Sequence, residues 1–177
     1  VGIIVDDTEA ERTGPWRTST LRPNHVGAHY LATDKDKGPY SIKWKATLPR
    51  AGTYEVRVSF GGGKGLARTA PYLVRHAGGE TRLIIDQTPK PTIRGLWYPI
   101  GRFTFGTPTV DREPAPATAE ILLTDKNTKG HVIADAIQLV HLDDLEKDDQ
   151  TPASDFAADL KKLGQELKKL KEEAPRL

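Results

Sequence analysis

The sequence contains no cysteine and no methionine among its 177 residues. Without cysteine the chain has no disulfide framework, no thiolate metal site and no cysteine nucleophile. It also lacks any hydrophobic run that approaches the roughly 20 residues needed for a membrane-spanning helix. We therefore expect a soluble globular protein with no membrane span.

A strong charge excess of either sign is also missing. The chain has 26 Lys plus Arg against 24 Asp plus Glu, a formal net charge of +2. Dedicated nucleic-acid-binding domains usually carry a marked basic excess, so we expect no nucleic-acid partner. The first residues lack a basic region and a cleavage site, so we expect that they are not a signal peptide. Because the chain begins with Val1 rather than Met, we expect a mature form or a piece of a longer protein.

What the chain does have is a regular alternation of apolar and polar residues up to about residue 142. The alternation is clearest at 40–48 and 54–60, and a period of two places one face of a strand in the core and the other in water. Pro49–Gly52 lies between these segments and is typical of a turn, which predicts that they form a hairpin. Gly78 and Gly79 predict a second hairpin, between 72–76 and 81–86.

Weaker alternation predicts further strands at 1–5, 26–31, 100–105, 119–124 and 132–141. Eight or nine short strands separated by Gly, Pro and Asp turns predict an all-β protein, an antiparallel two-sheet sandwich of the jelly-roll type. Residues 7–24 and 106–118 lack apolar periodicity, and we expect long surface loops there.

The composition changes after His141. Residues 143–152 are rich in Asp and predict an acidic linker between a sandwich at 1–142 and an amphipathic helix at 153–174. In that helix one apolar stripe repeats at spacings of 4, 3, 4 and 3, as in a heptad. We expect the stripe to pack on the sandwich or on a partner, since it would not stay exposed on a monomer. Its members are Phe156, Leu160, Leu163, Leu167 and Leu170.

Catalytic signatures are absent. The sequence has neither an H-E-x-x-H zinc motif nor a G-x-S-x-G nucleophile elbow. Gly61–Gly65 contains a lysine, but it lacks the following Ser or Thr and the helix of a phosphate-binding loop. We therefore expect no catalytic residues; an enzyme assembled from distant loops is a third interpretation, and it would require a cleft with converging titratable groups.

Carboxylates next to the first and within the last predicted strand of the sandwich indicate a candidate metal site. Asp6 and Asp7 follow the first strand, and Asp135 lies within the last. If these strands are neighbours, Asp7 and Asp135 approach each other around a hard cation such as Ca²⁺, which prefers carboxylate and carbonyl oxygens. In the alternative interpretation, Asp135 accepts ordinary hydrogen bonds and Asp7 caps a turn. We expect no other cofactor.

An ordered series of short motifs resembles the golvesin C-terminal-like domain, which also occurs in xanthan lyases. The resemblance covers about residues 3–142, although the loop at 106–118 is longer than the short turn usual in that family. The motifs are Asp6-Asp7, Thr13–Trp16, Val26–Leu31, Leu48–Val56, Ala70–Val74, His76, Gly78-Gly79, Asp86–Thr88, Trp97, Ile100–Phe105 and Val132–Ala136.

The resemblance implies a jelly-roll sandwich like those of galactose-binding and carbohydrate-binding modules. Such modules are usually non-catalytic parts of secreted bacterial enzymes. The Lys/Glu/Leu composition of 160–175 is also similar to a helix in large secreted planctomycete proteins. The resemblance thus implies a polysaccharide-binding module of a larger bacterial protein in the extracellular space, the periplasm or the cell envelope.

Stacking and hydrogen bonding to sugar indicate which residues would bind such a ligand. A flat aromatic ring matches the C–H face of a pyranose, although most aromatic rings fill cores. The candidates are Trp16, Tyr30, Arg68, His76, Gln87, Trp97 and Tyr98. In the second interpretation, several of these residues build the fold. The domain would then pack against neighbouring domains or a partner and bind no sugar.

Overall fold

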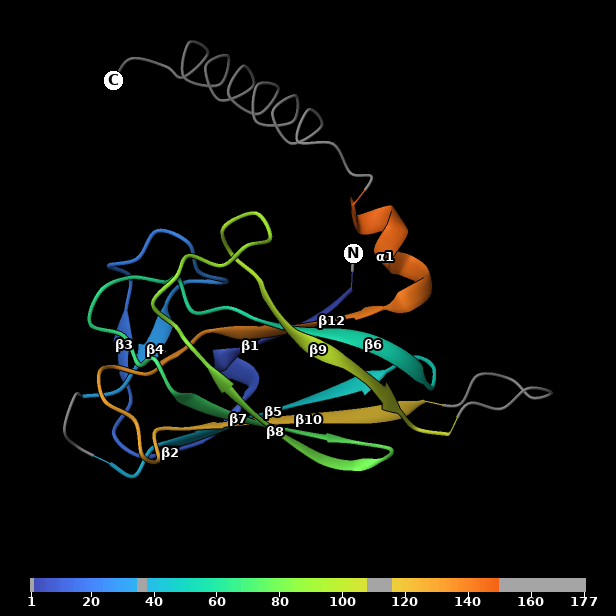
Figure 1. The fold of residues 1–177 in the computed structure, drawn as a ribbon, viewed down its shortest axis with the longest axis horizontal. Coiled ribbons are helices and arrows are strands. Elements are labelled where there is room, and N and C mark those ends of the chain that lie inside the picture. The colour runs from blue at the N-terminus through green and yellow to red at the C-terminus, as the bar shows by residue number, and fades with distance from the viewer. Residues whose placement is uncertain (1, 35–37, 108–115, 150–177) are drawn as a thin grey trace, which may run out of the picture. The chain divides into compact units, whose positions relative to one another are not determined.

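The computed structural model describes residues 2–34, 38–107 and 116–149 (Figure 1). Residues 2–142 form one compact unit. The helix α1 (Leu142–Asp149) leads into the rest of the chain and is described by itself. No helix in the described segments is long and apolar enough to cross a membrane.

Two antiparallel sheets form the sandwich, and Figure 1 shows one above the other. The order of the four-stranded sheet is β1 (Ile3–Asp6), β12 (Ala136–His141), β6 (Gly52–Val58) and β9 (Tyr98–Phe105). The order of the five-stranded sheet is β2 (Glu11–Thr13), β5 (Ser41–Leu48), β10 (Ala117–Thr124), β7 (Ala70–His76) and β8 (Gly79–Ile85). A small third sheet contains β11 (Ile133–Ala134), β4 (Tyr30–Ala32) and β3 (Arg17–Ser19).

The core lies between the two main sheets and follows the predicted alternation. Ile42 and Trp44 of β5 are buried with Ile121 of β10, while the residues between them lie at the outer face. From the other sheet, Val56 and Leu139 close the core. The all-β antiparallel sandwich predicted from the sequence is confirmed, because each ladder between the named strands is antiparallel.

One of the two predicted hairpins is wrong. The strands β5 and β6 do not pair with each other: β5 lies between β2 and β10, and β6 lies between β12 and β9. Residues 49–51 therefore carry the chain from one sheet to the other. Pro-Arg-Ala-Gly favours a reversal of direction, but it does not determine whether the next strand pairs or crosses over. The β7–β8 hairpin is confirmed, with His76 opposite Gly79.

Other segments differ from prediction in detail. The strand predicted at 26–31 is confined to β4, and the last strand is interrupted at Asp135 between β11 and β12. Part of 7–24 is regular, since it contains a 3-10 turn at Asp7–Glu9 together with β2 and β3. The predicted loop at 106–118 ends where β10 begins at Ala117, and its residues 108–115 lie outside the described residues.

Most of the described part of the segment predicted as an acidic linker is helical, because α1 covers Leu142–Asp149. Asp143 and Asp144 occupy its first turn, where carboxylates interact favourably with the positive end of the helix dipole. The amphipathic helix predicted at 153–174, with its leucine stripe, lies outside the described residues and stays a prediction.

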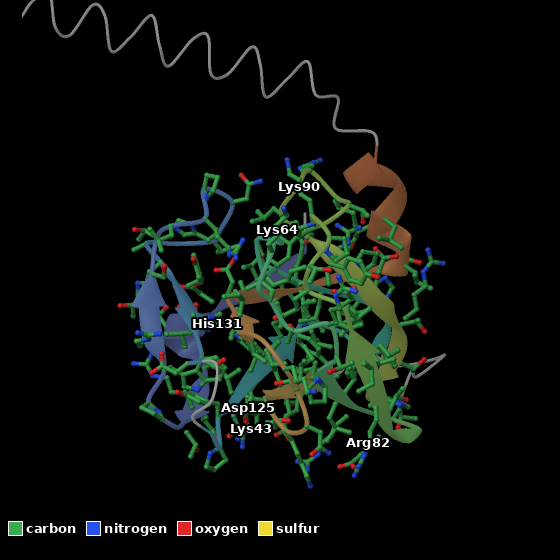
Figure 2. The ribbon with its side chains drawn as sticks, turned by 60° about the vertical axis from the view of Figure 1, so that its left-hand side comes forward. Lys43, Lys64, Arg82, Lys90, Asp125 and His131 are labelled. Atoms are coloured by element: carbon green, nitrogen blue, oxygen red, sulfur yellow. The ribbon has the colours of Figure 1, made fainter. Side chains whose placement is uncertain are left out.

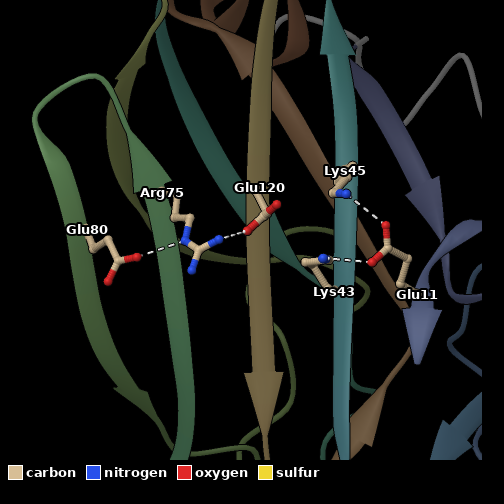
Figure 3. A network of polar contacts seen from close by, with 6 residues as sticks. All are labelled: Glu11, Lys43, Lys45, Arg75, Glu80 and Glu120. Atoms are coloured by element: carbon tan, nitrogen blue, oxygen red, sulfur yellow. Dashed lines mark hydrogen bonds and ion pairs between the residues drawn. The ribbon is translucent and has the colours of Figure 1, made fainter. Parts of the chain in front are cut away.

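Charged side chains form ion pairs across the outer face of the five-stranded sheet (Figure 3). Arg75 on β7 contacts Glu80 on β8, with Nε to Oε1 at 2.8 Å, and also contacts Glu120 on β10. Glu11 on β2 contacts Lys43 and Lys45 on β5, at 2.7 and 2.8 Å. Hydrogen bonds from the two lysines lower the pKa of Glu11 to about 2. The cations at the middle of this sheet therefore already have acidic partners.

Candidate functional site

A pocket of about 940 Å³ opens where β7 begins and β8 and β10 end. Residues of segments 64–69 and 127–130 line it, together with Thr88. We call it the basic pocket, because Lys64, Arg68 and Lys129 are among the lining residues and no acidic residue is. Neither lining segment belongs to a named strand, so the pocket is built from loops on a rigid sandwich.

Backbone hydrogen bonds hold these loops together. The Ala67 N–H donates to the His131 carbonyl at 2.8 Å, and the His131 N–H donates to the Gly65 carbonyl at 2.9 Å. The Gly63 N–H donates to the Thr88 carbonyl at 2.9 Å, which ties in the third segment. The wall of the pocket is therefore a set of paired backbones rather than three independent loops.

Gly130 is required for this close approach. Its φ of +92° is in the left-handed region, which favours glycine. A Cβ there would lie 2.9 Å from the Gly65 carbonyl oxygen and from the backbone of Leu66. Any side chain at residue 130 would push the two lining segments apart.

The charges around the basic pocket favour an anionic ligand. Thr88 donates to Asp86 from its hydroxyl at 2.6 Å and from its N–H at 2.8 Å, and these bonds lower the pKa of Asp86. The guanidinium of Arg68 lowers the pKa of Asp86 further. Asp86 itself does not line the pocket; its carboxylate orients Thr88 and partly offsets the charge of Arg68, while Lys64 and Lys129 have no such carboxylate in the lining.

A second pocket of about 550 Å³ adjoins the first and shares Thr69 and Asn127 with it. We call it the sheet groove, because residues of β7, β8 and β10 form most of its lining. Leu73, Ile84 and Leu122 are apolar members of the lining, and Arg82 and Lys126 are its charged members.

Three carboxylates gather at the end of β1, and we call Asp6, Asp7 and Asp135 the carboxylate cluster. Pairing between β1 and β12 places Asp6 opposite Ala136, next to Asp135. Asp135 accepts hydrogen bonds from the Val26 N–H and from the Ser59 hydroxyl. The Asp7 side chain is 0% exposed, and neither of its oxygens has a hydrogen-bond partner.

Burial and mutual repulsion make the charged forms of this cluster costly. Burial raises the pKa of Asp7 to about 7, and the charges of Asp6 and Asp135 add to the shift. Burial also raises the pKa of Asp135 to about 6, although the bonds from Ser59 and Val26 oppose the shift. Positive charges oppose the shifts only in part: Arg12 lowers the pKa of Asp7 and His25 lowers the pKa of Asp135. His29 Nε2 lies 3.7 Å from Asp7 Oδ1, a distance without a hydrogen bond.

The unpartnered oxygens of Asp7 fit a cation, which would supply the missing positive charge. Within residues 2–34, 38–107 and 116–149, however, no three His, Asp or Glu side chains form a group that could hold a metal ion. A cation would therefore take further ligands from backbone carbonyls and water, which Ca²⁺ accepts readily. The structure brings Asp7 and Asp135 near each other, and the metal stays a prediction.

The residues predicted from the sequence to contact a ligand do not gather at one place. Tyr30, Gln87 and Trp97 are buried. The Gln87 amide donates to the Tyr72 hydroxyl and the Ile133 carbonyl, and it accepts a hydrogen bond from the Ile133 N–H. Since these three side chains have almost no surface to offer a sugar, we do not include them in the candidate site.

The remaining predicted aromatic contacts are partly buried and engaged elsewhere. Trp16 donates from its indole nitrogen to the carbonyls of Thr13 and Ser41. The ring of Tyr98 packs on Phe60. His76 bonds the Thr81 hydroxyl at 2.8 Å. None of the three lines the basic pocket or the sheet groove.

Of the seven predicted residues, Arg68 alone lines the basic pocket. Sequence reasoning missed Lys64, Lys129, Thr88 and Asn127. The loops at 61–65 and 125–130 are rich in Gly and Lys, which marks them as exposed and basic. No local pattern indicates that the two loops meet.

Comparison with known proteins then assigns the family. Residues 3–141 match the golvesin C-terminal domain. The chain belongs to this family. The xanthan lyase of Bacillus sp. (strain GL1) is 31% identical over 147 residues, which cover 78% of this chain and 14% of that protein. The chain thus spans about one seventh of the length of this curated relative.

Solved structures agree with this assignment. A Paenibacillus xanthan lyase matches with a TM-score of 0.66 and 26% identity over 78% of this chain and 13% of the other. A family 35 carbohydrate-binding module from Paenibacillus barcinonensis matches with a TM-score of 0.51 and 17% identity, covering 98% of that module. The golvesin C-terminal domain described here therefore has a fold like that of a carbohydrate-binding module.

Proposed function

We propose that this golvesin C-terminal domain is a non-catalytic accessory module that binds polysaccharide, and that the basic pocket is its binding site. The observation that carries the proposal is the pocket itself, a loop-built recess with convergent polar groups on the fold of a carbohydrate-binding module. The name of the relative, xanthan lyase, supports a setting in which polysaccharide is the substrate of a neighbouring catalytic domain.

The proposal includes a larger parent protein located outside the cytoplasm. The chain covers only 14% of its curated relative, so the other domains of such a parent would lie next to this one. An accessory module of this kind binds polysaccharide and keeps the parent protein on its substrate. The alternative is a structural domain that contacts its neighbours and has no sugar ligand.

Titration of a polysaccharide panel, followed by calorimetry and affinity electrophoresis, tests the proposal. We expect at least one polysaccharide to bind at millimolar sugar or below, and Lys64→Ala combined with Arg68→Ala to weaken that binding at least about tenfold. Arg102→Ala is the matched control, because Arg102 is exposed on β9 in the other main sheet.

Thermal melting of the variants shows whether each one is folded. Loss of binding without a change in melting temperature supports the basic pocket. Equal binding by the pocket variant and the parent domain would show that the binding site lies outside the basic pocket. No binding to any polysaccharide of the panel would favour the structural alternative.

We also propose that a hard divalent cation, Ca²⁺, neutralises the carboxylate cluster. Support comes from the buried, unpartnered oxygens of Asp7 and from the approach of Asp135 across the β1–β12 pair. A cation that binds only the folded state raises stability by mass action, by about 2.7 kcal/mol at one hundred times its dissociation constant.

Melting in Ca²⁺, in Mg²⁺ and in EDTA tests this proposal. We expect Ca²⁺ to raise the melting temperature by several degrees and Mg²⁺ to do so less, because Mg²⁺ requires stricter octahedral geometry. Calorimetric titration should give one Ca²⁺ per chain, and Asp7→Asn should abolish it. Identical melting curves in Ca²⁺ and EDTA would refute the site.

A further inference from the structure

The basic pocket and the sheet groove form one continuous surface. They share Thr69 and Asn127, and their volumes are about 940 and 550 Å³. Figure 2 shows Lys64 of the pocket and Arg82 of the groove well separated on the molecule. A ligand in contact with both residues must therefore be a chain rather than a single sugar.

Positive charge follows this surface from one end to the other. No acidic side chain is among the residues that line either part. The lining cations are Lys64, Arg68, Lys129, Arg82 and Lys126.

Other cations on the five-stranded sheet, outside the lining of this surface, form ion pairs with carboxylates. Arg75 is held between Glu80 and Glu120, and Lys43 and Lys45 share Glu11 (Figure 3). Among the described residues, none of the five lining cations forms such an ion pair with a carboxylate. The sheet therefore neutralises its central cations. Along the continuous surface Arg68 interacts with the nearby Asp86 carboxylate, and the other four lining cations are available to an external anion.

Apolar side chains lie in the groove between the charged positions. Ile84 is 62% exposed, an unusual exposure for a large apolar residue on a strand. With Leu73 and Leu122 it provides an apolar strip next to Arg82. Such a strip matches the C–H faces of pyranose rings, while the cations match charged substituents on the same chain.

We infer that the basic pocket and the sheet groove together bind a segment of an acidic polysaccharide, one whose sugars carry carboxylate groups. This inference rests on the proposed function and names its ligand class. The arginines can bind a carboxylate through two parallel hydrogen bonds, and the lysines act as point charges. Nucleic acid is the less suitable polyanion, because the net charge is only +2 and no exposed aromatic ring among the described lining residues offers a stacking platform.

The test pairs each acidic polysaccharide with its own carboxyl-reduced form. Xanthan, polygalacturonate, alginate and hyaluronate are titrated into the domain beside their reduced counterparts. We expect at least one acidic form to bind at least about tenfold more tightly than its reduced counterpart. We also expect its affinity to fall as salt is raised, because salt screens exposed charges.

Oligomers of increasing length test the continuity of the surface. Arg82→Gln with Lys126→Gln should weaken long oligomers about tenfold and leave short ones unchanged. Arg68→Gln should weaken both, and Arg102→Gln on the other main sheet should weaken neither. Equal melting temperatures establish that each variant is folded.

Each outcome separates this inference from the proposed function. Equal binding of acidic and reduced forms would overturn the acidic ligand and keep a glycan-binding module. If none of the acidic or neutral polysaccharides bound, both the acidic-ligand inference and the proposed function would be overturned. Equally tight binding of polyglutamate or double-stranded DNA would also overturn the inference, because it would show general polyanion exchange.

Discussion

Replacing Gln87 with alanine is expected to destabilise the domain by about 3 to 5 kcal/mol, the largest effect predicted for a single polar side chain here. The Gln87 side chain is 0% exposed. Its amide bridges the Tyr72 hydroxyl on β7 and both backbone groups of Ile133 on β11, at 2.8 to 3.2 Å. Alanine would leave these three groups buried without partners and would open a cavity beside them.

Urea unfolding monitored by tryptophan fluorescence measures this effect. The matched comparison is Arg68→Gln, which changes an exposed side chain in the neighbouring loop and should leave the free energy of unfolding within about 0.5 kcal/mol of the parent value. If Gln87→Ala lowered polysaccharide affinity while stability stayed at the parent value, Gln87 would be a ligand contact after all. The hydrogen-bond assignment would then be wrong.

Asp7→Asn is expected to stabilise the domain at pH 8 in EDTA, by about 3 kcal/mol. Burial raises the pKa of Asp7 from 3.8 to about 7, so the folded state holds a proton that the unfolded state has already released between pH 4 and pH 7. Stability of the parent domain therefore falls as pH rises through that interval. Asparagine keeps the shape of the side chain without its charge. The part of the pH dependence of the unfolding free energy that is due to residue 7 therefore disappears.

The groups around Asp7 set the size of this effect. The charges of Asp6 and Asp135 add to the rise in its pKa, and Arg12 opposes it. His29 faces the same carboxylate at 3.7 Å.

Urea unfolding from pH 4 to pH 8, in EDTA and then in Ca²⁺, gives the comparison. In EDTA the variant should be the more stable protein at pH 8, and in saturating Ca²⁺ the order should reverse, since asparagine lacks the charge that the cation requires. Parallel pH profiles of parent and variant in EDTA would contradict the buried charge. Glu9→Gln serves as the control for a nearby carboxylate, because Glu9 is exposed and lies two residues along the chain from Asp7.

Alternation along the chain was enough to predict the sandwich and its longer strands, but not the short strands β2 and β3 within the predicted loop 7–24. It works because each strand of a two-sheet sandwich buries one face, as Ile42 and Trp44 of β5 do. It could not predict that β5 and β6 lie in different sheets. Both strands would show the same alternation whether they paired with each other or across the core, and the turn at Pro49–Gly52 fits either path.

The candidate site was less predictable, because its members come together only through long-range pairing. Lys64 and Lys129 line the same pocket because His131 accepts a backbone hydrogen bond from Ala67 and donates one to Gly65, which joins two distant loops. Gln87 follows a strand and resembles an ordinary polar loop residue until the backbone of Ile133 covers it. The first and last strands of a jelly roll lie close together, and β1 and β12 do pair, which places Asp6 opposite Ala136 and next to Asp135; a metal held by Asp7 and Asp135 stays a prediction.

The β1–β12 pair also determines how the domain responds to mechanical force. Antiparallel pairing places Ile3 opposite Leu139 and Asp6 opposite Ala136, so the chain enters and leaves the sandwich at one end of the same ladder. Tension between the two ends would load these pairs one after another, as in a zipper, rather than all at once in shear. The last pair to open adjoins the carboxylate cluster. A cation bound there would therefore resist the final step of strand separation.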